Sequence, residues 1–185
     1  NMIHGLNRRR ARYIIEVVGS SGIPPQWGFQ FFSAGLEPFL QVIEQDYLDA
    51  FIQDGGSSFK LVVGTYGGGK THFLYSVREL AWKHDFLVTY CPLSHNDSPL
   101  YRLDLVYKSI VTNLMRPLQP DELMSGAEKG LGAFLKGVYS DLSASLDADG
   151  LRPAERTARL QSLAADAVRA VENPNFGRAI RLALE

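Results

Sequence analysis

The feature that most constrains this chain is a glycine-rich stretch that begins at Gly64 and ends at Thr71. With Gly69 and Lys70 between them, these residues fit the phosphate-loop pattern G-x-x-x-x-G-K-[ST] at every position. Glycines let the backbone curl so that successive N–H groups point inward, where they can bind phosphate oxygens. A helix that begins there adds unpaired N–H groups and a partial positive charge. The pattern therefore predicts a phosphate site in a strand–loop–helix unit.

The predicted cofactor-binding residues are those of the loop and the first helical residues: Gly64, Thr65, Tyr66, Gly67, Gly68, Gly69, Lys70, Thr71 and His72. Lys70 is expected to reach the β- and γ-phosphates, and the Thr71 hydroxyl is expected to ligate Mg²⁺. We predict that these two residues are catalytic, with ATP and Mg²⁺ as cofactors. Because His72 follows the loop directly, we expect it on the helix surface rather than in catalysis.

The sequence around the loop supports this interpretation. Leu61-Val62-Val63 is apolar and partly β-branched, as in a buried strand. After the loop, apolar side chains recur on one helical face: Phe73, Leu74, Val77, Leu80 and Ala81. The alternative is a glycine-rich surface loop followed by an ordinary helix.

The remaining pattern predicts an α/β fold, a P-loop NTPase-like parallel sheet with a helical C-terminal extension. Residues 86–91 read as a second strand, and strand–helix–strand units are right-handed and form parallel sheets. We expect a nucleotide-binding domain over residues 1–118 and a helical extension over 119–185. Further helices are expected near residues 99–115, 121–144, 152–172 and 175–183.

Two N-terminal clusters each have two interpretations. A predicted helix over residues 7–18 carries a basic start of four arginines, which either contacts nucleic acid or nucleotide phosphates or is a solvated face. Residues 26–32 are predicted to be extended, and their aromatics either stack on an adenine or fill a core. Ser33 is expected to cap a helix that ends near Gln53, with Pro38 in its first turn.

A polar segment follows the second predicted strand, where open α/β sheets bind ligands. Its site candidates are Ser94, His95, Asn96 and Asp97. A polar loop that caps the next helix is the alternative, because Ser98-Pro99 is a favourable helix start. In that helix we expect six apolar side chains to face inward: Leu100, Leu103, Val106, Tyr107, Ile110 and Leu114.

Composition narrows the class of protein. The chain has 185 residues, 45% of them hydrophobic, which is enough for a core. Its net charge of -1 gives no global signal for nucleic-acid or membrane binding. The single cysteine, Cys91, suits a reducing cytoplasm, and no apolar run reaches membrane-spanning length. We therefore expect a cytoplasmic protein without membrane partners.

A second acidic residue, which phosphate-loop NTPases use to hold Mg²⁺, does not follow any apolar strand in the sequence. Either the chain stops before the remaining strands, or the protein binds nucleotide without hydrolysing it. We expect truncation, because two strands make an incomplete sheet. A partner chain, including a second copy, or the helical extension would then cover the exposed sheet edge.

Several stretches resemble one family. Gly55–Lys60 leading into Gly64–Leu74 resembles the ATP-binding domain of the BREX phage-defence ATPases, the BrxD-like P-loop family. The arginine-rich start with Gly22–Pro25, and the stretch from Leu93 to Val111, are similar too. The resemblance covers roughly residues 8–115.

The resemblance implies an AAA+/STAND-like ATPase fold, a cytoplasmic location, and a role in bacterial defence and DNA transactions. It also implies a Gly-Arg-Glu box that cradles the adenine. The matching stretch here is Ala34–Glu37, in which Leu36 replaces the arginine. The predicted function is an ATP-binding, ATP-hydrolysing domain of a defence- or DNA-associated ATPase. The alternatives are a non-catalytic nucleotide-dependent switch or adaptor for a protein or DNA partner, and a small-molecule or nucleotide kinase.

Overall fold

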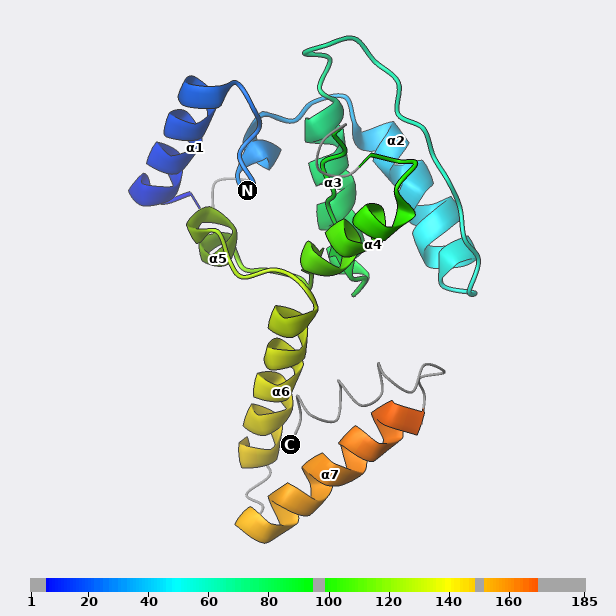
Figure 1. The fold of residues 1–185 in the computed structure, drawn as a ribbon. Coiled ribbons are helices and arrows are strands. Elements are labelled where there is room, and N and C mark those ends of the chain that lie inside the picture. The colour runs from blue at the N-terminus through cyan, green and yellow to red at the C-terminus, as the bar shows by residue number, and fades with distance from the viewer. Residues whose placement is uncertain (1–5, 95–98, 149–151, 170–185) are drawn as a thin grey trace. The chain divides into compact units, whose positions relative to one another are not determined.

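The computed structural model describes residues 6–94, 99–148 and 152–169, and most of these residues are helical (Figure 1). The helices are α1 (Arg8–Ser21), the 3₁₀-helix η1 (Phe29–Phe32), α2 (Glu37–Val42), the π-helix η2 (Ile43–Ile52), α3 (Lys70–Lys83), α4 (Leu103–Thr112), α5 (Pro120–Ser125), α6 (Leu131–Ala148) and α7 (Pro153–Arg169). The strands are β1 (Val88–Thr89) and β2 (Leu114–Met115).

The chain divides into two compact units. Unit 1 comprises residues 1–88 and 115–127, and unit 2 comprises residues 89–114 and 128–185. The glycine-rich loop lies in unit 1. The predicted division into domains at residues 118 and 119 stays a prediction.

The predicted fold class, an α/β fold with a parallel sheet, is wrong. In the described residues, strand structure is limited to β1 and β2, which pair antiparallel, and the fold is helical. The predicted second strand is thus reduced to Val88–Thr89, and its partner is β2 rather than Leu61–Val63. A parallel strand buries both faces and needs neighbours along its edges, and within the described chain Leu61–Val63 has none.

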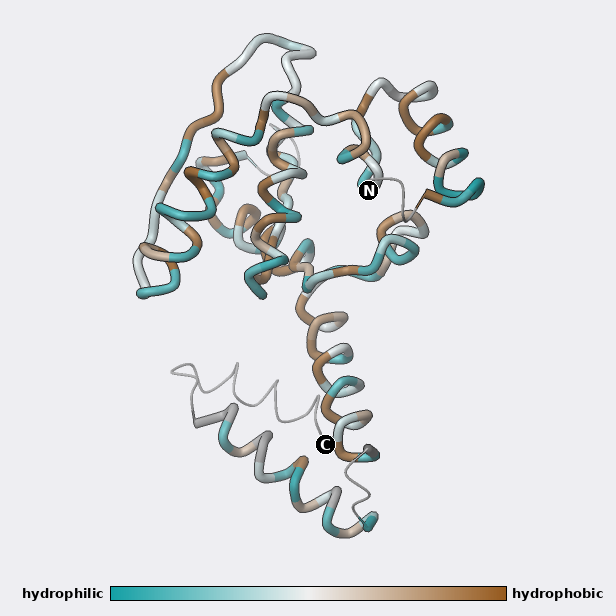
Figure 2. The backbone as a smooth tube through the Cα atoms, turned by 180° about the vertical axis from the view of Figure 1, so that it is seen from behind, coloured by the Kyte–Doolittle hydropathy of each residue, from teal (hydrophilic) through white to brown (hydrophobic). Residues whose placement is uncertain are grey.

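The predicted strand before the loop is therefore an exposed, extended segment. Leu61 is 75% exposed and Val63 is 83% exposed. Figure 2 shows this stretch as an apolar run on the long tube that leaves the end of η2. The sequence has the composition of a buried strand, but nothing described in this chain buries it.

The first predicted helix is confirmed as α1. The Asn7 side chain accepts a hydrogen bond from the Arg10 N–H at 2.9 Å, which satisfies one of the unpaired donors at the helix start. Gly22 ends the helix at a φ of 63°, and its N–H donates to the Val18 carbonyl at 3.1 Å. A left-handed residue at this position is most easily supplied by glycine.

The aromatic segment was predicted to be extended, but its residues Phe29–Phe32 form η1. Gly28 precedes it at a φ of 93°. Phe29 is 1% exposed and fills the core, whereas Phe32 is 48% exposed. Ser33 does not cap the next helix. Leu36 precedes α2 instead, although Pro38 does lie in its first turn as predicted.

Helix α3 is the centre of unit 1, and it packs against α2 and η2 (Figure 1). Arg78 on this helix is 3% exposed. Its guanidinium donates to the Gln26 side-chain oxygen at 2.6 Å and to the Gln26 carbonyl at 2.5 Å. It also lies over the rings of Tyr75 and Trp82, at 4.8 Å and 4.7 Å from their centroids. This network fixes the segment before η1 on α3.

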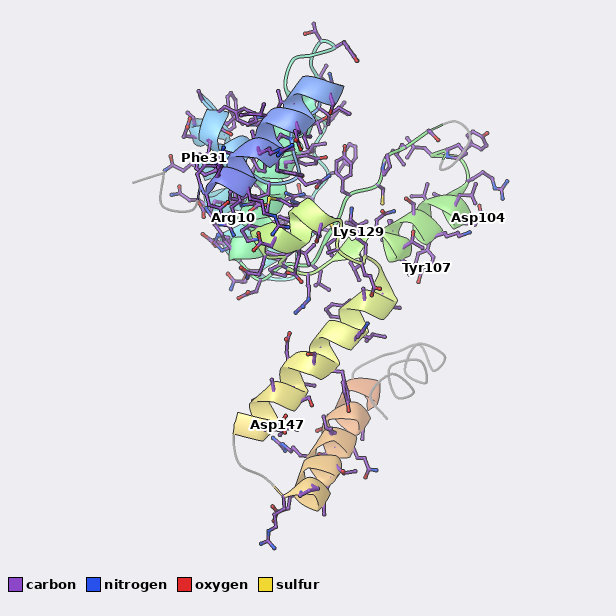
Figure 3. All side chains as sticks on the ribbon, turned by 90° about the vertical axis from the view of Figure 1, so that its left-hand side faces the viewer. Arg10, Phe31, Asp104, Tyr107, Lys129 and Asp147 are labelled. Atoms are coloured by element: carbon purple, nitrogen blue, oxygen red, sulfur yellow. The ribbon has the colours of Figure 1, made fainter. Side chains whose placement is uncertain are left out.

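Helix α4 in unit 2 is shorter than predicted, and several of its side chains that were expected to be buried are exposed. It begins at Leu103, not near residue 99, and Leu103, Tyr107 and Ile110 are 75%, 68% and 43% exposed rather than buried. Figure 3 shows Asp104 and Tyr107 projecting outward from this helix. The Arg102 guanidinium holds the pKa of the Asp104 carboxyl below its usual value, because it donates hydrogen bonds at 3.0 Å and 2.8 Å.

The C-terminal helices follow the predictions in part. The helix expected over residues 121–144 is two helices, α5 and α6, because Gly126 and Gly130 between them have positive φ values of 75° and 97°. The helix predicted near residues 152–172 is present as α7. The predicted helix over residues 175–183 lies outside the described residues, and so do the site candidates His95, Asn96 and Asp97.

Candidate functional site

The loop curls at two glycines and leads directly into α3. Gly67 and Gly69 have φ values of 77° and 80°, a conformation that residues with a Cβ rarely adopt. Between them, the Gly68 N–H donates to the Thr65 carbonyl at 3.1 Å and closes a tight turn. Gly69 is the N-cap of α3, so the helix begins at Lys70 as the sequence predicted.

The main-chain amides of the loop and the first helical turn are mostly unpaired. The first main-chain bond of α3 joins the Phe73 N–H to the Gly69 carbonyl at 2.9 Å. In the part of the chain that the structure describes, no protein acceptor meets the N–H groups of Tyr66, Gly67, Gly69, Lys70, Thr71 and His72. Unpaired amides at a helix N-terminus form a site that favours an anion.

Lys70 brings a positive charge to the same place. Its Nζ donates to the Gly64 carbonyl at 2.9 Å and to the Thr65 carbonyl at 2.6 Å. The side chain therefore folds back across the loop, and its ammonium group lies against the curl. An ammonium group has three donors, so one remains for another acceptor.

A cavity of about 680 Å³ adjoins the end of the loop in unit 1. Gly68, Gly69 and Lys70 contribute its polar side. Its other walls are mainly apolar. They come from the segment before the loop, from the region of η1 and α2, and from the first turn of α3: Leu61, Val62, Val63, Phe32, Ser33, Ala34, Leu36, Phe39, His72 and Phe73. A volume of this size suits a small-molecule ligand.

His72 is half-buried in the cavity wall, so the prediction of a helix-surface position is only partly met. Its Nε2 contacts the Ser33 hydroxyl. Its ring lies edge-on to Phe29 at 5.3 Å and to Phe32 at 5.5 Å between centroids. Burial lowers the pKa of the imidazole below its ordinary value.

The structure brings some predicted site residues together and leaves others apart. Four line the cavity, namely Gly68, Gly69, Lys70 and His72. Tyr66 is fully exposed, and Thr71 is half-buried in the first turn of α3 outside the cavity lining. Sequence reasoning missed the role of Ser33, because no local pattern predicts its contact with a side chain 39 positions later.

The basic start of α1 makes contacts within unit 1. Arg10 lies over the Trp27 ring at 5.1 Å and forms an ion pair with Asp121 at 3.5 Å. Arg12 pairs with Glu16 at 2.7 Å. Two of the four arginines thus bind protein groups, while Arg8 and Arg9 are exposed.

The described residues offer few side chains that could hold a metal ion at this site. No group of three histidine, cysteine or carboxylate side chains that could hold a metal occurs in the described residues. The Thr71 hydroxyl fits a Mg²⁺ ion only as one ligand among waters and substrate oxygens, which is the coordination that Mg²⁺ commonly keeps.

None of the described helices is both long and apolar enough to span a membrane.

One family model matches this chain, whereas searches of curated proteins and of solved structures found no similar protein. The family model of the BREX system ATP-binding protein BrxC/D matches residues 6–184, which is almost the whole chain. The chain therefore belongs to the BREX system ATP-binding protein BrxC/D family.

Proposed function

We propose that this chain binds ATP with residues 64–72, and that the phosphates lie on the N-terminus of α3. The observation that supports this most directly is the set of unpaired amides at Tyr66, Gly67 and residues 69–72. They surround a turn formed by two left-handed glycines. A triphosphate supplies the acceptors that these donors lack. Membership of an ATP-binding family supports the same proposal.

Lys70 is proposed to neutralise the phosphate charge. Its ammonium group is held by the Gly64 and Thr65 carbonyls, at the curl of the loop. A phosphate oxygen competes well for these donors, because a charged acceptor makes a stronger hydrogen bond than a neutral carbonyl does. The Thr71 hydroxyl would be the protein's ligand to a Mg²⁺ ion on the phosphates. That ion would balance charge on the phosphate oxygens.

Hydrolysis is a separate proposal. We infer that the protein is an ATPase of a cytoplasmic bacterial defence system, that it acts with DNA or defence-complex proteins, and that homo-oligomers are one form of this assembly. The cavity lining in the described chain contains no carboxylate, and phosphate-loop enzymes use one to hold Mg²⁺. This favours a second candidate function, nucleotide binding without turnover by this chain alone. ATP turnover by this chain would exclude it.

Calorimetry with ATP and Mg²⁺ tests the binding proposal. We expect Lys70→Ala to weaken ATP affinity at least about tenfold, because the variant loses a charged hydrogen bond to phosphate. The matched control is Lys83→Ala, which removes an exposed lysine at the other end of the same helix. Circular dichroism should show unchanged helical content in both variants. Equal ATP affinity in the two variants would refute the proposal.

A further inference from the structure

A contact between α3 and the end of η1 crosses one side of the cavity. Ser33 follows the last residue of η1, and His72 is the third residue of α3. The Ser33 hydroxyl donates to the Phe29 carbonyl at 3.0 Å. The same hydroxyl contacts the His72 Nε2. The Ser33 side chain thus links α3 to the end of η1.

The same contact fixes an aromatic wall. Phe32 lies next to Ser33 in the chain, is 48% exposed and lines the cavity. Its ring lies edge-on to the His72 ring at an interplanar angle of 71°. Phe29, which is buried, contacts His72 edge-on at 79°. The position of Phe32 relative to Lys70 is therefore set through His72, only two residues from the lysine.

We propose that Ser33 and His72 form a positioning pair that holds the Phe32 wall at a fixed place relative to the phosphate-binding turn, so that the site recognises the planar base of a nucleotide as well as its phosphates. This inference rests on the proposed ATP binding. A planar base offers a π-face that an aromatic side chain can contact. A ligand that consists of phosphates alone would not use this wall.

The test compares ATP with inorganic tripolyphosphate, both measured by calorimetry with Mg²⁺. The variants are Ser33→Ala, His72→Ala and the double variant. We expect each single variant to bind ATP about threefold to tenfold more weakly, the equivalent of one hydrogen bond. The ATP affinity of the double variant should equal that of the weaker-binding single variant, because both changes remove the same contact. Affinity for tripolyphosphate should change less than about twofold.

Two controls separate positioning from loss of structure. Ser33→Thr keeps the hydroxyl and should retain most of the ATP affinity. Ser57→Ala removes an exposed serine in the segment before the loop and should have no effect. A merely structural role would weaken both ligands equally.

Additive effects of the two single variants on ATP affinity would overturn the inference. So would equal losses for ATP and tripolyphosphate. In both cases the native chain still binds ATP, so the proposed function survives. A native chain that binds neither ligand, or a Lys70→Ala variant with unchanged affinity, contradicts the proposed function itself.

Discussion

The two flanks of the glycine-rich loop have opposite environments. On the helical side, α3 buries Leu80 and Arg78, which are 7% and 3% exposed. On the other side, Leu61 and Val63 are 75% and 83% exposed. Both flanks are apolar in sequence, so composition does not explain the difference. The helix satisfies its own backbone groups, whereas a strand needs a neighbouring strand to do so.

This difference shows that the two flanks of the loop depend on different interactions. The loop and α3 form from local features: left-handed glycines, a helix start at Lys70 and a stripe of apolar side chains. Leu61–Val63 has the composition of a strand buried on both faces, but the described chain provides no adjacent strand. The half of the site that we propose to bind phosphate is therefore built without the sheet that the sequence pattern expects.

The largest expected effect comes from the buried network on α3. Arg78→Ala should reduce the free energy of unfolding by about 3–5 kcal/mol, because it leaves a cavity and removes the guanidinium from its buried partners. Urea denaturation measures this loss, with the fluorescence of Trp27 and Trp82 in unit 1 as the readout. Arg12→Ala is the control, because that side chain is 80% exposed. Equal stability of the two variants would contradict the assigned role of the network.

The same substitution on each flank sharpens the comparison. Leu80→Ala should cost about 2–5 kcal/mol of stability, because it empties a buried position. Leu61→Ala should change stability by no more than about 0.5 kcal/mol, as is usual for exposed positions. The same urea denaturation measures both. A large loss from Leu61→Ala would show that the segment before the loop is buried in solution, and the contrast between the flanks would fail.

A smaller loss than at Arg78 or Leu80 is expected within the loop. Gly69→Ala should cost about 1–2 kcal/mol, the penalty for a Cβ in a left-handed conformation. This penalty is purely conformational, because a Cβ built at Gly69 meets no atom within 4 Å. Gly64→Ala is the matched control, since its Cβ would make only ordinary contacts with the Lys70 side chain at 3.6 Å and 3.8 Å. Thermal unfolding should rank the control as the more stable variant, and the reverse order would exclude a left-handed Gly69.

Local patterns predicted the helices better than they predicted their surroundings. The periodicity of α1 and α3 located both helices, and Asn7 and Gly69 mark their starts. The same periodicity placed Tyr107 and Leu103 on an inward face of α4, yet both are exposed. Periodicity identifies an apolar face, but it does not identify what covers that face. For the same reason the sequence could not reveal that Ser33 meets His72.

By itself the sequence determined the glycine turn and the start of the following helix, because backbone conformation and helix starts depend on neighbouring residues. It also determined the chain's family. Only the tertiary structure decided that Leu61–Val63 has no strand partner, that Arg78 is buried on Gln26, and that His72 faces the Phe32 wall. Each of these depends on contacts between residues far apart in the chain, and such contacts leave no spacing in the sequence from which they can be predicted.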